Sequence, residues 1–358
     1  MNDRQRPDAI ESIPLRDPIP DVAVVIANWN GADHLEACLA ALRRQTLRQR
    51  MTVVVVDNGS TDGSPAVLAR FADLARVIAN PTNLGFAVAC NQGIAAAGPA
   101  EFVALLNNDA VPEPDWLEQM IRAMGQDQRI GCATPKVLSA ADRTVFDNAG
   151  HAVFADGLTR GRGRLEVDAG QYDRQEEVFG PSGCAALLRR RMLDDIGLLD
   201  EHFFAYCEDA DLAFRARLRG WTCVYVPTAV VYHEFSATTE AFSAFKAMHV
   251  ERNRLWLAVK NLPLPLLLVS PGFTLLRYWW QGVGALSHRG ASGRFTAANS
   301  RSALALILLR AYLQAARGLP RVLRQRRQIQ RRSRVSTREC WHWLRRFGLS
   351  ARDIAFME

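Results

Sequence analysis

The chain has 358 residues, of which 49% are hydrophobic and 23% are charged, and its mean hydropathy is −0.08. These values are ordinary for a protein with a buried core, and they exclude a disordered chain, a collagen-like chain and a multi-span membrane protein. The net charge of +7 is uneven: residues 317–358 carry +9, which leaves −2 for residues 1–316. A cationic tail fits an anionic membrane surface or a nucleic acid. The seven scattered cysteines include no CxxC pair, which favours a reducing compartment over a metal cage or a disulfide framework.

Residues 1–20 are polar and lack an apolar segment, so we expect a flexible leader rather than a secretory signal. From residue 22 onward, β-branched runs alternate with stretches of helical periodicity. Strands are predicted at 22–26, 52–56, 76–78 and 101–106, and helices at 34–44, 65–71, 87–97 and 112–124. This alternation predicts an α/β fold in which a mostly parallel central sheet is flanked by helices. Ligands bind such sheets at the carboxyl ends of the strands, so the residues that follow each strand are the functional candidates.

The second half of the chain is less regular. Strand-like runs occupy 145–154, 223–226 and 229–232, and helical patterns occupy 209–219, 239–260 and 302–316. Residues 261–276 carry no charge, but they include three prolines and are too few to span a bilayer. With the aromatic residues that follow and the Arg-rich tail, they favour an interfacial segment over a proline-broken segment packed on the enzyme. We therefore expect a catalytic domain over 21–260 and a helical, membrane-associating region over 261–358.

Polar residues follow the first three predicted strands. Trp29 and Asn30 come after the first strand, and Asp57 ends the second, before a turn rich in Gly, Ser and Asp. Such residues can form a structural turn and a helix cap, but after a buried strand Asp57 can also accept the imide N–H of a uracil or thymine base. Asn83 and Gly85 precede the helix that bears Asn91. A tight loop of this kind either simply starts a helix or approaches a phosphate or ribose closely.

Acidic residues supply the candidates for metal binding and proton transfer. Asp109, preceded by Asn107 and Asn108, suits Mg²⁺ or Mn²⁺ that completes its shell with substrate phosphates, although a polar turn is the plainer interpretation. Glu208, Asp209 and Asp211 begin a predicted helix, where they complement the helix dipole or provide a general base. Asp211 pairs with Arg215 at i,i+4, which leaves Glu208 or Asp209 for that work. His233 is a functional candidate only if it binds the same metal ion as Asp109.

Six segments together resemble the family 2 glycosyltransferases of GT-A fold, particularly bacterial rhamnosyltransferase-like members that build surface polysaccharides. In order over residues 22–238 they are VVIANWNG, VVVVDNGSTDGS, NPTNLGFAVACNQGI, FVALLNNDAVPEPDWL, GPSGCAALLRRRMLDDIGLLDEHFFAYCEDADLAFRARLRGW and VYHEFSAT. The resemblance implies an enzyme that moves a sugar from a nucleotide diphosphate to an acceptor hydroxyl and inverts the anomeric centre. One departure is that the DXD-type motif reads Asn107-Asn108-Asp109, with a single acid.

The resemblance also implies roles for individual positions. Ala27, Trp29 and Asp57 would hold the base and ribose, and Gly183 would line the sugar pocket; Asp109 and His233 would bind Mg²⁺ or Mn²⁺, and Asp209 would be the general base. We also expect Asn30, Asn83, Gly85, Asn91 and Asn108 to contact the donor, and Glu208 to assist the base.

The expected partners follow from the same resemblance and from the tail. They are a dTDP- or UDP-linked sugar donor, a lipid-linked saccharide acceptor and an anionic membrane surface, with no nucleic acid. The expected location is the cytoplasmic face of the bacterial inner membrane, with peripheral attachment. Two alternatives are weaker. A nucleotidyltransferase would want a basic phosphate loop, and VIANWNGADH has no Lys or Arg. A non-catalytic adaptor that binds nucleic acid or a membrane through the tail, near Trp341 and Trp343, does not explain the acidic residues in the rest of the chain.

Overall fold

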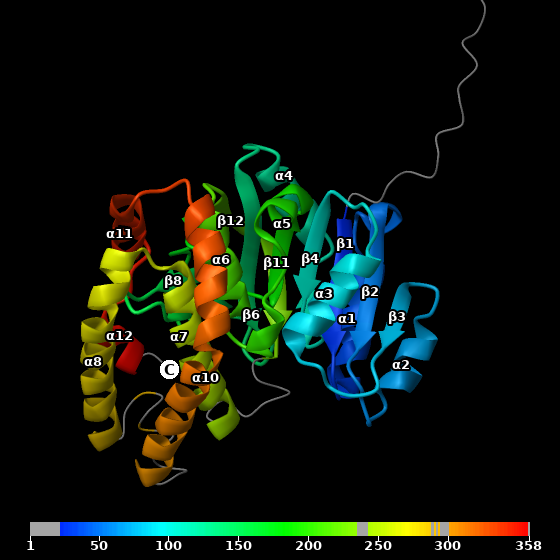
Figure 1. Ribbon diagram of the computed structural model, residues 1–358. Helices are drawn as coiled ribbons and strands as arrows, with labels where there is room; N and C mark the ends of the chain where they lie inside the picture. Colours follow the sequence, from blue (N-terminus) through cyan, green and yellow to red (C-terminus); the bar gives the residue numbers. More distant parts are fainter. Residues whose placement is uncertain (1–21, 235–242, 288–289, 291–292, 294–300, 357–358) are drawn as a thin grey trace, which may run out of the picture.

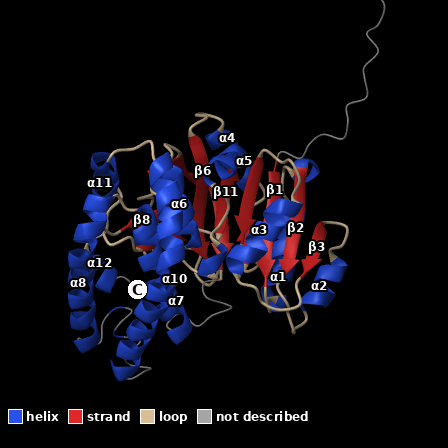
Figure 2. Ribbon diagram, viewed as in Figure 1, coloured by secondary structure: helices blue, strands red, loops and turns tan. Residues whose placement is uncertain are grey.

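The structure is a computed structural model that describes residues 22–234, 243–287, 290, 293 and 301–356. The predicted leader, 1–20, and the end of the last resembling segment, 235–238, lie outside the described residues. A mixed sheet with helices on both faces forms one part of the molecule, and a group of helices from the C-terminal third lies beside one end of the sheet (Figures 1 and 2).

Residues 22–106 form the parallel part of the sheet, as predicted. Its strands are β1 (Val22–Asn28), β2 (Met51–Asp57), β3 (Ala75–Ala79) and β4 (Phe102–Leu106), and its helices are α1 (Ala32–Arg43), α2 (Ser64–Arg70) and α3 (Phe86–Ala96). Both faces of β1 are buried, because Val24 and Ile26 pack in one hydrophobic cluster and Val25 packs in another with Ile94 of α3. Helix α3 approaches β1 so closely at Gly93 that an added Cβ would lie 2.3 Å from a methyl group of Val25.

The middle of the chain completes a ten-stranded sheet with the strand order β10-β12-β6-β11-β4-β1-β2-β3, while β5 pairs with β12 and β7 with β6. Because β11 runs antiparallel between β4 and β6, the sheet is mixed rather than mostly parallel. The run predicted at 145–154 divides into two short strands, and the runs at 223–226 and 229–232 join into one long strand with a register shift. The elements are β5 (Ala110–Pro112), α4 (Trp116–Met124), β6 (Ile130–Ser139), β7 (Phe146–Asn148), β8 (His151–Val153), β9 (Thr159–Gly161), β10 (Glu176–Val178), β11 (Ala185–Arg189), α5 (Arg190–Ile196), α6 (Glu208–Leu218) and β12 (Thr222–His233), with short 3₁₀ turns at Arg48–Arg50 and Glu201–Phe203.

The C-terminal third is helical, with α7 (Ala244–Asn261), α8 (Leu264–Leu286), α10 (Arg301–Arg332), α11 (Thr337–Arg346) and α12 (Ala351–Phe356). The apolar segment expected to be interfacial is part of α8, which continues through Pro271. None of the helices in the described ranges is long and apolar enough to cross a bilayer. Helix α8 has two contrasting faces. Its buried residues include Thr274 and Arg277, whereas an exposed stripe of large apolar side chains recurs at intervals of four and seven: Leu264, Leu268, Leu275, Trp279 and Leu286.

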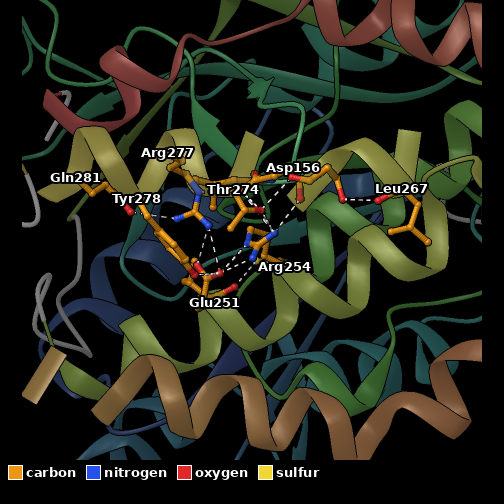
Figure 3. A network of polar contacts seen from close by, with 12 residues as sticks. Asp156, Glu251, Arg254, Leu267, Thr274, Arg277, Tyr278 and Gln281 are labelled. Carbon is orange, nitrogen blue, oxygen red and sulfur yellow. Dashed lines mark hydrogen bonds and ion pairs between the residues drawn. The ribbon is translucent and has the colours of Figure 1, made fainter. Parts of the chain in front are cut away.

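A buried network of charges joins α8 to the catalytic domain (Figure 3). Nε of Arg277 lies 2.8 Å from Oδ2 of Asp156, in the turn between β8 and β9, and its Nη2 lies 3.1 Å from Oε2 of Glu251 on α7. Arg254 of α7 also pairs with both acids. Burial alone would raise the pKa of Glu251, but Arg254 and Arg277 lower it to about 2. The two guanidinium groups and two carboxylates thus neutralise one another inside the protein.

Several arginines of the cationic tail bond to the rest of the protein. Nη1 of Arg326 donates to the carbonyls of Val259 and Leu262, and Arg332 and Arg346 form ion pairs with acids of the catalytic domain. Apolar residues from both sides of the predicted boundary at 260, including Trp256 and Val322, share one hydrophobic cluster. Part of the positive charge that suggested a membrane or a nucleic acid therefore attaches the tail to the enzyme.

Because of this network, we expect two Arg→Met substitutions, one buried and one exposed, to differ greatly in their effect on the free energy of unfolding. Arg277→Met leaves Asp156 and Glu251 buried with one cation fewer, and we expect it to lower the free energy of unfolding by about 3–5 kcal/mol. Arg122→Met removes an exposed i,i+4 pair with Glu118 on α4, and we expect a loss below about 1 kcal/mol. Urea denaturation of both variants measures the contrast, and equal small losses would contradict the importance of the network.

Candidate active site

The carboxyl ends of the central strands open into a cavity of about 1040 Å³. Its lining includes Ala27 and Trp29, the pair Asp109 and His233, Asp209 at the start of α6, and residues of α7, α8 and α10. The candidates that sequence patterns placed after separate strands therefore meet in one space.

Buried amides and a carboxylate crosslink the strand ends near Trp29. The parallel register sets Asn28 opposite Asp57. Nδ2 of Asn28 donates to Oδ1 of Asp57 over 3.0 Å, and Oδ1 of Asn28 accepts a 2.7 Å hydrogen bond from Asn108. The hydroxyl of Ser60 also donates to Asp57. These bonds orient the polar groups behind the nucleotide end of the cavity, and sequence reasoning had not included Asn28 among the site residues.

Asp109 and His233 meet because β5 pairs with the end of β12. Nε2 of His233 lies 3.2 Å from Oδ1 of Asp109, and its Nδ1 lies 2.8 Å from Oδ2 of Asp147. Burial alone would lower the pKa of His233, but interactions with Cys184, Asp109 and Asp147 raise it well above its ordinary value. Oδ1 of Asp109 is buried and accepts no hydrogen bond from the described residues. A carboxylate that fixes one ring nitrogen while the other faces a second carboxylate is an arrangement typical of histidines that bind metals.

These residues fit a divalent cation that takes only two protein ligands. Within the described part of the chain, no group of three or more His, Cys, Asp and Glu side chains forms a metal cage. Mg²⁺ and Mn²⁺ are commonly held by one or two carboxylate or imidazole groups, with substrate phosphate and water in the remaining positions. Asp109 and His233 match this pattern, and Asp147 would orient the imidazole.

The pKa values of the neighbouring acids Asp209 and Glu208 are shifted in opposite directions. Oδ2 of Asp209 accepts a 2.8 Å hydrogen bond from the Gly183 N–H and lies 3.4 Å from Nε2 of His151. Burial would raise the pKa of Asp209, but His151 and the N–H groups of Gly183 and Ala210 lower it below its ordinary value. Burial and the charge of Asp209 raise the pKa of Glu208 well above its ordinary value. Of the two acids, Asp209 is therefore suited to accept a proton near neutral pH.

The loop before α6 has an unusual backbone conformation. Phe204, Tyr206 and Cys207 have φ angles of 65°, 69° and 69°, in the left-handed region that residues other than glycine rarely adopt. Nδ2 of Asn253 on α7 donates to the carbonyls of Phe203, Ala205 and Tyr206, at 3.0, 2.9 and 2.8 Å. Helix α7 thus fixes the loop that positions Asp209.

The structure separates the predicted site residues into two groups. Ten of them line the cavity: Ala27, Trp29, Asn83, Gly85, Asn108, Asp109, Gly183, Glu208, Asp209 and His233. The other three, Asn30, Asp57 and Asn91, do not. Asn30 accepts a hydrogen bond from the Thr61 N–H, Asp57 lies behind Asn28, and Asn91 is bonded through its amide to both backbone groups of Leu199. Asn91 therefore has a packing contact in place of the donor contact that was expected.

Sequence reasoning missed several residues of the site. His151 and Asp147 lie in the run predicted as a strand at 145–154, but nothing in that pattern marked their side chains as functional. Arg160, Arg164 and Lys246 also line the cavity, and their only signal in the sequence was positive charge.

Comparison with known proteins agrees with this geometry. Residues 23–197 match the model of the family Glycosyl transferase family 2. N-acetylglucosaminyl-diphospho-decaprenol L-rhamnosyltransferase of Mycobacterium tuberculosis is 29% identical over 270 residues, which are 69% of this chain and 86% of that protein. Pre-mycofactocin glycosyltransferase of the same species is 28% identical over 276 residues, or 76% of this chain and 55% of that protein.

Two solved structures share the fold. GalNAc-T7 with UDP, GalNAc and Mn²⁺ aligns with a TM-score of 0.56 at 16% identity, over 68% of this chain and 48% of that one. The mannosyltransferase PcManGT from Pyrobaculum calidifontis, in complex with GDP-Man and Mn²⁺, aligns with a TM-score of 0.51 at 20% identity, over 87% of this chain and 85% of that one.

The sheet, the cavity at its strand ends and the paired Asp109 and His233 define a glycosyltransferase of GT-A fold. Residues 23–197 form a glycosyltransferase family 2 domain, and the chain has rhamnosyltransferase-like relatives.

The opposite pKa shifts of Asp209 and Glu208 predict different effects of two isosteric substitutions. Asp209→Asn removes the proton acceptor, and we expect sugar transfer to slow by about 10²–10⁴-fold while donor binding persists. Glu208→Gln removes a carboxyl group whose charged form is disfavoured by burial and by Asp209, and we expect transfer within a few-fold of the wild-type rate. Steady-state kinetics with a binding measurement would separate the two. Equal losses in both variants would contradict the assignment of Asp209.

Proposed function

We propose that this enzyme transfers a sugar, rhamnose in the first instance, from a dTDP- or UDP-linked donor to a hydroxyl of a lipid-linked saccharide, with inversion of the anomeric centre. The observation that carries the proposal is the single cavity that contains the nucleotide-end residues, the Asp109–His233 pair and the ionised Asp209. The similarity to the N-acetylglucosaminyl-diphospho-decaprenol L-rhamnosyltransferase of Mycobacterium tuberculosis supports the choice of sugar and acceptor.

The proposed reaction is a single displacement. Asp209 accepts the proton of the acceptor hydroxyl while the hydroxyl oxygen attacks C1 of the donor sugar, and the bond from C1 to the diphosphate breaks. His151 and the Gly183 N–H hold the Asp209 carboxylate in position for this transfer. Because attack comes from the side opposite the leaving group, the configuration at C1 inverts. General-base assistance of this kind is worth about 10²–10⁴ in rate.

The negative charge that develops on the leaving diphosphate also has to be stabilised. A divalent cation, Mg²⁺ or Mn²⁺, would supply that electrostatic stabilisation when bound. Asp109 and His233 would hold it, and Asp147 would keep Nε2 of His233 directed at the site by hydrogen bonding to Nδ1. At the other end of the donor, Ala27 and Trp29 would contact the base, and Asp57 would hold Asn28 in place from behind.

A binding experiment tests the donor and the cation together. We expect UDP or dTDP with Mn²⁺ or Mg²⁺ to stabilise the protein against thermal unfolding, by about 2.7 kcal/mol at a hundred times the dissociation constant. Asp109→Asn should weaken this binding at least tenfold, while the exposed Asp73→Asn should leave it unchanged. Nucleotide binding that is independent of both metal and Asp109 would contradict the role of the Asp109–His233 pair. No binding of any nucleoside diphosphate would contradict the proposed function.

We also propose that the enzyme attaches peripherally to the cytoplasmic face of the bacterial inner membrane. The exposed stripe of α8 supports this, because Leu268, Leu275 and Trp279 are 71%, 69% and 70% exposed on one face of the helix. Helix α10 also exposes leucines, including Leu309 and Leu313. Apolar side chains inserted at the headgroup level, together with nearby cations, are sufficient for reversible attachment to anionic lipid.

Point substitutions test the membrane proposal better than truncation does, because removal of the C-terminal helices would uncover the hydrophobic cluster that includes Trp256. The triple change Leu268→Ser, Leu275→Ser and Trp279→Ser should reduce co-sedimentation with vesicles of phosphatidylglycerol and phosphatidylethanolamine at least tenfold. The exposed Leu165 and Val167 of the catalytic domain, both changed to Ser, provide the matched control. Equal binding by the triple variant and the control would rule out α8 as the attachment face.

A further inference from the structure

An aromatic side chain that the proposed reaction has not used borders the cavity. Phe245, in the first turn of α7, lines the cavity and is 42% exposed. The cavity also holds the base Asp209, so Phe245 presents an apolar ring to the space in which sugar transfer is proposed to occur.

Two neighbouring rings hold Phe245 in place. The imidazole of His249 lies with its centroid 4.0 Å from that of Phe245, and the two planes are 38° apart. The ring of Phe204 approaches from another direction, with 6.1 Å between centroids and 75° between planes. Nδ1 of His249 donates to the carbonyl of Phe245 over 2.9 Å, which fixes the imidazole. The Phe245 ring is therefore positioned before a ligand binds, and its remaining surface is accessible.

The face of α7 that carries Phe245 also holds the loop that leads to the base. Phe245, His249 and Asn253 are four residues apart, so they lie on one face of the helix. Phe245 and His249 both contact the ring of Phe204, and Asn253 donates to three carbonyls of residues 203–206. Because this loop runs directly into the start of α6, the same contacts join Phe245 to the backbone that carries the base.

The contacts of Phe204 place this ring next to the donor loop as well. A Cβ added at Gly85 would lie 2.6 Å from Cδ2 of Phe204, so Phe204 packs directly against the loop expected to contact the donor. The residues assigned to the donor base, Ala27 and Trp29, come from the end of β1, whereas Phe245 comes from α7. In the proposed reaction the acceptor is the substrate that brings its hydroxyl to the base, so a sugar in contact with Phe245 is best assigned to the acceptor.

The chemistry of Phe245 suits a sugar ring. The face of an aromatic ring is electron-rich, and it attracts the weakly positive C–H groups that a pyranose presents on one side. A pocket of this kind combines an apolar or aromatic surface with a few polar groups that fix the orientation of the ligand. Phe245 would supply the surface, and the carboxylate of Asp209 would select the hydroxyl that reacts.

We propose that Phe245, supported by His249 and Phe204, is the surface on which a saccharide ring of the acceptor stacks while one of its hydroxyls meets Asp209. This inference rests on the proposed function. It makes Phe245 a determinant of acceptor binding that the donor nucleotide does not need.

Binding measurements on the full-length protein test this assignment. Saturation-transfer NMR would use the methyl glycosides of glucose, galactose and N-acetylglucosamine, in the presence of dTDP or UDP with Mn²⁺. Thermal unfolding would measure dTDP, UDP and dTDP-rhamnose with Mn²⁺. Phe245→Leu keeps an apolar side chain but removes the aromatic face, and we expect it to weaken glycoside binding about fivefold or more and to change binding of the three nucleotides less than about twofold.

Two further variants complete the design. Phe245→Tyr keeps the aromatic face and should bind the glycosides within about twofold of the wild-type affinity. Trp341→Leu removes an exposed aromatic ring on α11, outside the residues that line the cavity, and should change neither kind of binding.

Three results would overturn the proposal. They are unchanged glycoside binding in Phe245→Leu, equal weakening of glycosides and dTDP-rhamnose by that change, and no saturation transfer from the wild-type protein to any of the three glycosides. The second result would assign Phe245 to the donor sugar. Failure of the wild-type protein to bind any nucleoside diphosphate would instead count against the proposed function itself, so the two failures are distinguishable.

Discussion

The pairing of β5 with the end of β12 is the constraint on which the site depends. This short antiparallel contact sets His233 opposite Ala110, and the Glu234 N–H donates to the carbonyl of Asp109 over 3.0 Å. Two residues separated by 124 positions in the sequence are thereby brought to 3.2 Å at their side chains. Because β12 also lies beside β6, whose edge carries β7, the same pairing brings Asp147 to the far side of the imidazole.

The C-terminal helices contribute to the catalytic geometry as well as to the surface. Asn253 holds the strained loop before Asp209, and Arg254 and Arg277 fix the β8–β9 turn through Asp156. The hairpin of that turn carries His151, which contacts Asp209, and Arg160, which lines the same cavity. A shift of α8 at a membrane surface would therefore move the β8–β9 hairpin, which adjoins the base Asp209. The proposed membrane attachment is in this way coupled to proton transfer.

Local patterns in the sequence were sufficient to predict the parallel half of the sheet and most of the residues that line the cavity. Buried β-branched runs identify β1 and β2, and the polar residues that follow strands converge because parallel strands end at one edge. β11 was not predicted, because the run Ala185–Arg189 gives no sign of its antiparallel position between β4 and β6. Because Pro227 interrupts the apolar run, the sequence predicted two strands where the structure has the single strand β12. His151, Asp147 and Arg160 could not be placed, since their roles arise from tertiary contacts of an irregular region.

The proposed mechanism depends most on Asp109 and His233 holding a divalent cation beside the donor diphosphate. A crystal structure of the enzyme with Mn²⁺ and UDP or dTDP tests it most directly, through the anomalous scattering of manganese. The account predicts a single strong peak in contact with Oδ1 of Asp109 and Nε2 of His233, with the diphosphate next to it. A diphosphate bound instead at Arg160, with no manganese at Asp109, would contradict the account.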